Sequence, residues 1–166
     1  PVLRALAIGK PGDSDLLYLK VEIFEKFGFS GLYGTEKIPV FRFGEAVIVK
    51  TFDLPTLMAT KIRAVLNRKW KKTSKTGETL AVVKGRDYYD LMWYFQKGVR
   101  PNLDCIESVK DMKELKGVLR DSVMKIDDKS MKYDLEALIA DKNLVGNIAE
   151  NIKKILLGYI NNLPDA

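Results

Sequence analysis

The stretch KGRDYYDLMWYFQKG, residues 84–98, places two aspartates inside one of the most aromatic segments of the chain. Its spacing predicts a helix over 86–97, with four apolar side chains on one side: Tyr88, Leu91, Met92 and Phe95. Asp87 and Asp90 fall on roughly the opposite arc with Arg86, which we expect to pair with Asp90 at i,i+4. Aspartate is almost never fully buried without a partner, so these acids require an explanation.

The preceding segment, LPTLMATKIRAVLNR (residues 54–68), predicts a second helix with Asp53 as its N-cap. One apolar stripe follows its inner face: Leu54, Leu57, Met58, Ile62, Val65 and Leu66. Lys61 lies within this stripe, where a lysine is unfavourable unless it meets an acid. Two interpretations follow. Lys61 and the aspartates form a structural ion pair, or they line a polar cleft.

Two more helices are predicted further along the chain. The first is predicted over residues 104–128, with a possible break at Gly117. Its inner face consists of Ile106, Val109, Met112, Leu119, Val123 and Ile126. Residues 145–163 repeat apolar side chains at three and four positions: Val145, Ile148, Ile152, Ile155, Leu156, Tyr159, Ile160 and Leu163. The C-terminal half is therefore expected to be mainly helical.

The N-terminal part is expected to form strands, because alternating apolar segments are separated there by glycine-rich turns. These segments cover 2–8, 16–24, 37–43 and 45–52, and the last is predicted to be an inner strand because it is almost wholly apolar. The predicted fold class is α+β. A small mixed sheet (residues 1–52) is followed by a helical domain (residues 53–166).

Composition excludes several classes of protein. With 46% hydrophobic and 30% charged residues among 166, the chain is typical of a globular protein, and no apolar run is long enough for a transmembrane helix. It contains no histidine, which excludes Ser-His and Cys-His nucleophile pairs. The single Cys105 fits a reducing, cytoplasmic setting. Chemistry must therefore rely on carboxylates, lysine, arginine or tyrosine, either alone or together with a hard metal such as Mg²⁺.

The net charge of +6 is concentrated in one segment. Residues 61–86 hold nine Lys or Arg against Glu78 alone, a balance of +8 that leaves −2 for the rest of the chain. Such a segment attracts phosphates of nucleotides or nucleic acids. From charge alone, the more typical explanation is a solvated loop. Residues 69–84 have no helical period, and a β excursion is predicted at LAVV.

The two helical segments, in this order, resemble the last two motifs of the AbiEii-type nucleotidyltransferase toxins, of the DNA polymerase β nucleotidyltransferase superfamily. That family carries a helix with (A)xKxxAxxxR, a spacer and then RDxxDLxxL. This chain matches with two sets of residues: Ala59, Lys61, Ala64 and Arg68, then Arg86, Asp87, Asp90 and Leu91.

The resemblance implies a split active site and a role for each matching residue. It implies Lys61, Asp87 and Asp90 as catalytic residues, and Lys61, Arg68 and Arg86 as nucleotide-binding residues. Four lysines of the basic loop would guide a nucleic acid: Lys69, Lys71, Lys72 and Lys75. Glu22 is the candidate ligand for Mg²⁺, and the alternative is that it is an exposed strand glutamate.

The resemblance also implies a function. The chain is expected to be part of a Mg²⁺-dependent enzyme that transfers a nucleotide from NTP to an RNA, such as tRNA, or to a protein. It would be the toxin of a toxin–antitoxin or phage-defence pair, with a cognate antitoxin. No GS…DxD motif is present, so we expect a C-terminal portion that is inactive alone. The alternative is a non-catalytic basic module that binds nucleic acid.

Overall fold

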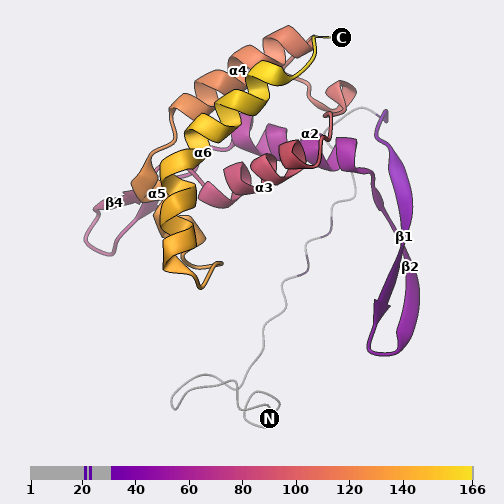
Figure 1. The fold of residues 1–166 in the computed structure, drawn as a ribbon, viewed down its shortest axis with the longest axis horizontal. Coiled ribbons are helices and arrows are strands. Elements are labelled where there is room, and N and C mark those ends of the chain that lie inside the picture. The colour runs from indigo at the N-terminus through magenta and orange to yellow at the C-terminus, as the bar shows by residue number, and fades with distance from the viewer. Residues whose placement is uncertain (1–20, 22, 24–30, 166) are drawn as a thin grey trace.

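The computed structural model describes residues 21, 23 and 31–165, and Figure 1 shows two hairpins and a group of helices. Its elements, in chain order, are β1 Thr35–Arg42, β2 Glu45–Phe52, α2 Leu54–Asn67, β3 Lys72–Thr73, β4 Thr79–Ala81, α3 Gly85–Gln96, the 3₁₀ turn η1 Leu103–Cys105, α4 Met112–Met124, α5 Asp128–Leu135 and α6 Lys142–Asn162. The α+β class is confirmed. The strands predicted over 2–8 and 16–24 lie outside the described residues, apart from Val21 and Ile23. The division into two domains stays a prediction.

β1 and β2 form an antiparallel hairpin that projects from the helices (Figure 1). Phe43 and Gly44 form its two-residue turn, with φ of 54° and 80°. Both angles lie in the left-handed region that turns of this type require. The first six residues of β2 are exposed, so the prediction of an inner strand is wrong for the described chain. The apolar sequence indicated burial, but among the described residues β2 pairs with β1 alone, in a sheet of two strands.

The base of this hairpin is fixed to the start of α2 by hydrogen bonds. Asp53 accepts from the Thr56 backbone N–H at 2.9 Å, which confirms it as the N-cap of α2. The Gly34 N–H donates to Thr56 Oγ1 at 2.9 Å, and Asn102 Nδ2 donates to the Leu32 carbonyl. A Cβ at Gly34 would lie 1.8 Å from Asp53 Oδ2, so a side chain there would displace the cap.

In the described part of the chain, the core lies among the five helices α2 to α6. α6 packs against α3, α4 and α5, and α2 packs against α3 and α4 (Figure 1). Met58, Ile62 and Leu91 are completely buried in it, as the helical spacing predicts. Leu54 is 38% exposed, because it is the first residue of α2 and lies beside the hairpin base rather than over the core.

The single helix predicted over 104–128 is wrong. η1 ends at Cys105, and α4 begins only at Met112, after the N-cap Asp111. The Asp111 carboxylate accepts from the Glu114 N–H at 2.8 Å, and this local bond competes with continued helix. The break predicted at Gly117 is also wrong, because that glycine lies inside α4.

α5 is a separate helix that the apolar spacing did not predict. Asp127 caps its start by accepting from the Ser130 N–H. The helix predicted over 145–163 is confirmed as α6, which begins slightly earlier because Asp141 caps it.

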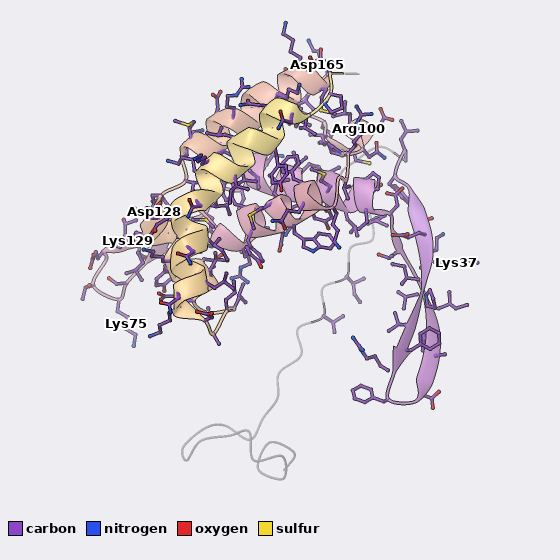
Figure 2. All side chains as sticks on the ribbon, viewed as in Figure 1. Lys37, Lys75, Arg100, Asp128, Lys129 and Asp165 are labelled. Carbon is purple, nitrogen blue, oxygen red and sulfur yellow. The ribbon has the colours of Figure 1, made fainter. Side chains whose placement is uncertain are left out.

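Between α2 and α3 the basic loop forms the short β3–β4 hairpin, which confirms the β excursion. β4 packs against α5, and the Val82 N–H donates to Ser130 Oγ at 2.9 Å. At the tip of this hairpin, Lys75 projects away from the helices (Figure 2). The loop is thus anchored at its C-terminal end and exposed along its lysines.

Candidate functional site

Lys61 projects from the middle of α2 toward α3 and meets both aspartates of the RDxxD motif. Its Nζ lies 2.7 Å from Asp90 Oδ2 and 3.2 Å from Asp87 Oδ1. The expectation that Lys61 pairs with these acids is confirmed. The geometry explains how a lysine is tolerated among apolar neighbours, since its charge is compensated at both carboxylates.

Asp87 is the buried centre of this cluster, with 3% of its surface exposed. It binds a second cation, because Arg68 Nη1 donates a short hydrogen bond to its other oxygen, Oδ2. Asp87 also lies in the first turn of α3, where the helix dipole favours negative charge. Two cations and a helix N-terminus together compensate one buried carboxylate.

Asp90, by contrast, opens to solvent. Its side chain is 45% exposed, whereas that of Lys61 is 25% exposed. Burial of Lys61 disfavours its charge, but the hydrogen bond to Asp90 and the charges of both aspartates outweigh this, so the pKa of Lys61 is raised. The ammonium therefore stays charged at neutral pH. The cluster has a closed side at Asp87 and an open side at Asp90.

Arg86 contacts a different acid from the one predicted. Its Nε and Nη2 donate to Asp134 of α5 at 3.3 and 3.1 Å, and its backbone N–H also donates to Asp134. The predicted pair between Arg86 and Asp90 is therefore wrong. The planar guanidinium prefers a bidentate carboxylate, and Asp90 is occupied by Lys61. The role of Arg86 in nucleotide binding stays a prediction, which this fork weakens.

Asp134 is a residue that sequence reasoning missed. It is 5% exposed and lies on the inner side of α5 with Ser130, four residues earlier. Both are polar residues at helical spacing among Met131 and Leu135. That pattern in the sequence could have indicated polar partners on a neighbouring helix.

A small cavity lies behind the closed side of the cluster. Its volume is about 40 Å³, and its lining includes Arg68, Trp70, Lys84 and Asp87. A space of this size holds a water molecule or so and not a nucleotide. At the other side of the cluster, the Asp90 side chain is 45% exposed.

The described residues contain no cluster of three side chains of the types that usually bind metals. Among residues 21, 23 and 31–165, no three acidic or cysteine side chains lie close enough together to hold a metal ion. Asp87 and Asp90 are both engaged by Lys61. Glu22, the predicted Mg²⁺ ligand, lies outside the described residues.

The four lysines predicted to contact nucleic acid remain on the surface of the loop. Lys69, Lys71, Lys72 and Lys75 are all exposed. The ammonium of Lys72 lies 5.9 Å from the ring centre of Tyr133, a weak cation–π contact. Their charges are available to a polyanion, and this fits both a binding surface and a solvated loop.

Comparison with known proteins places the chain in a family. The family model described as "Nucleotidyl transferase AbiEii toxin, Type IV TA system" matches residues 8–160. The chain belongs to this family. The AbiEii resemblance is thereby confirmed, and with it the assignment to the nucleotidyltransferase toxins of toxin–antitoxin systems, which implies an antitoxin partner. No curated protein and no solved structure matches the chain. Among its described helices, none has the length and apolar character needed to cross a membrane.

Proposed function

We propose that the Lys61 cluster (Lys61, Arg68, Asp87 and Asp90) forms part of the nucleotide site of a transferase that moves a nucleotide from NTP to an acceptor. Lys61 would bind phosphate oxygens and stabilise the negative charge that develops during transfer. The observation that carries this proposal is the half-exposed Asp90, which holds a charged lysine at the edge of a buried network.

The geometry suggests a distinct task for each member of the Lys61 cluster. A lysine ammonium has three donors, and two are directed at Asp87 and Asp90, which leaves one for a phosphate oxygen. Asp90 would orient the ammonium from the open side. Asp87 and Arg68 would fix its position from the closed side, and Arg68 is 38% exposed, so it could also meet a phosphate.

The remaining parts of the proposal rest on the family. An RNA, such as tRNA, or a protein hydroxyl would be the acceptor, and a cytoplasmic antitoxin would neutralise the activity in a phage-defence setting. Mg²⁺ dependence also rests on the family alone, because the described residues contain no cluster of three metal-binding side chains.

Two substitutions in the full-length protein test the site. Lys61→Met and Asp90→Asn should each reduce transfer of labelled nucleotide at least ~100-fold, because the charge at the phosphates is removed or misplaced. The matched control is Glu107→Gln, which removes the 3.5 Å ion pair to Arg63 on another side of α2. That control should keep full activity. Transfer would be followed with α-labelled NTPs, and toxicity by growth without antitoxin.

Stable Lys61→Met and Asp90→Asn proteins with wild-type transfer would contradict the site. Lys61→Met should change the free energy of unfolding by no more than about 1 kcal/mol, since Asp87 keeps Arg68 and Asp90 faces water. A loss of activity could then not be attributed to unfolding.

The second candidate function is a non-catalytic module that binds nucleic acid through the β3–β4 loop. The exposure of its four lysines favours this candidate. It predicts salt-dependent RNA binding with no transfer of label from any NTP, whatever residue occupies position 61.

A further inference from the structure

Trp93 is an exposed aromatic residue one helical turn beyond Asp90. Its surface is 42% exposed, although it lies on α3 between the buried residues Met92 and Phe95. More than half of its surface is buried by packing, and the remaining part of this large aromatic side chain is open to a ligand.

The ring is held in a defined position by two neighbours. The ring of Tyr94 packs edge-on against it, with centroids 5.0 Å apart and planes at 82°. Lys97 Nζ lies 5.8 Å from the centre of the Trp93 ring. The Tyr94 contact fixes the ring, which reduces the entropy lost when a ligand stacks on it. Lys97 lies over one face of the ring, and this flexible side chain would move aside for a ligand that stacks on that face.

Trp93 also lies beside the Lys61 cluster. Asp90 and Trp93 are three residues apart on α3, and residues at this spacing are neighbours on a helix surface. Tyr94, which contacts Trp93, lies within electrostatic reach of the same cluster. Burial raises the pKa of Tyr94, the Lys61 charge lowers it and the Asp90 charge raises it.

We propose that Trp93 is the stacking platform for the base of the nucleoside triphosphate whose phosphates Lys61 binds. This inference rests on the proposed function and adds the base-binding side of the same site. The open side of the cluster, at Asp90, leads along α3 to Trp93, so one ligand with an anionic end and an aromatic end fits both features.

Stacking on an aromatic side chain tolerates every base, because each base has a π face. We therefore expect ATP, GTP, CTP and UTP to gain affinity from Trp93 to similar extents. Inorganic triphosphate should gain none, because it offers only the anionic end. Its binding should depend on the Lys61 cluster and not on Trp93.

The test is binding to the full-length protein, measured by calorimetry and by tryptophan fluorescence. Trp93→Leu should weaken ATP binding about 10-fold and raise KM with little change in kcat, whereas inorganic triphosphate should bind as before. Trp93→Phe, which keeps a smaller aromatic face, should recover most of the affinity. Trp70→Phe is the control. The sequence contains two tryptophans, and Trp70 lines the small cavity rather than the exposed surface of α3.

The outcomes separate the two proposals. ATP binding that is unchanged in Trp93→Leu would overturn the stacking platform while leaving Lys61 in place. If Lys61→Met leaves the affinity for inorganic triphosphate unchanged, the proposed function itself is overturned. A third outcome would also overturn the assignment to the NTP base. In that outcome single-stranded RNA quenches the fluorescence of the wild-type protein but not of Trp93→Leu, and none of the four NTPs quenches it.

Discussion

Helix α3 is joined to two of its neighbouring helices by two ion-pair networks that look alike at first. The Lys61 cluster joins it to α2 through Asp87, which is 3% exposed, and the Arg86–Asp134 fork joins it to α5 through Asp134, which is 5% exposed. Each network contains one buried carboxylate with cationic partners. The two networks differ in one respect. The Lys61 cluster has a second carboxylate, Asp90, which is exposed, and among the described residues the Arg86–Asp134 fork has none.

This difference separates structural charge from charge that needs another explanation. A buried acid requires cations once it is desolvated, so Asp134 with Arg86 and Asp87 with Arg68 are explained by packing alone. Asp90 has no such requirement, because water reaches it. Lys61 could compensate Asp87 without it, so the exposed pair is the part of α3 that packing leaves unexplained.

The largest effect on stability is expected at Asp87. Asp87→Asn should lower the free energy of unfolding by roughly 3 kcal/mol, the lower end of the cost of breaking a buried ion pair, because Lys61 and Arg68 retain contact with water. Urea denaturation measures this change. Asp90→Asn is the comparison on the same helix and should lose less than about 1 kcal/mol. Equal losses at both positions would remove the distinction between the closed and open sides.

A smaller loss is expected at the Arg86–Asp134 fork. Asp134→Asn should cost about 2 kcal/mol, in the range of hydrogen bonds to charged groups, because the amide cannot accept from both guanidinium nitrogens and the backbone N–H. Nucleotide transfer at low temperature should be unchanged. A large rise in KM for NTP in this folded variant would instead indicate that Arg86 serves the nucleotide.

High pH should separate the two networks again. The pKa of Lys61 is raised, so its contribution to stability is complete below about pH 10.4 and is lost as pH rises through its folded pKa. Arg86 does not deprotonate in this range. Lys61→Met should therefore show a shallower loss of stability between about pH 10 and 12, and Asp134→Asn should show the wild-type slope.

Tyr88 contributes to the same pH window and needs its own control. Burial, with the nearby Asp87 charge, raises the pKa of Tyr88 to about 12. A phenol that ionises less readily in the folded state resists deprotonation there, so unfolding is favoured progressively as pH rises from about 10, its unfolded pKa, toward that value. Tyr88→Phe removes this contribution while keeping the ring. An alkaline slope that is identical with and without Lys61, in the Tyr88→Phe background, would contradict the prediction.

The smallest effect concerns cations that belong to neither network. Replacing Lys69, Lys71, Lys72 and Lys75 by Gln should reduce the slope of log K against log salt for single-stranded RNA by about 0.7 for each phosphate that the loop no longer neutralises. Stability should hardly change, because all four are exposed. An unchanged slope would show that these lysines are solvated surface residues that do not contact RNA.

Much of the fold follows from local signals in the sequence. Asp53 before α2 and the apolar spacing of α3 and α6 predict their helices, because capping and amphipathicity act over a few residues. The failure at 104–128 has the same origin. The apolar residues keep helical spacing across this segment, but the N-cap at Asp111 makes the helix begin only at Met112.

The candidate site was only partly predictable for a different reason. Lys61 on an inward face signalled an acidic partner, and the motif spacing named Asp87 and Asp90. The second cation on Asp87 and the partner of Arg86 depend on how α2 and α5 pack against α3. Ion-pair partners 19 or 48 residues apart leave no periodic trace in a sequence.

The turn of the β1–β2 hairpin bears on how the protein can be handled. Phe43 has a φ of 54° and its ring is fully exposed, at a position where Asn is the residue that the backbone prefers. Phe41 and Ile48 beside it are also more than two-thirds exposed. Within the described residues, the hairpin tip is therefore a group of exposed apolar side chains that favours association at high concentration. Phe43→Asn relieves the turn and removes an adhesive ring in one change, which makes it the first substitution to try for crystallisation or NMR samples.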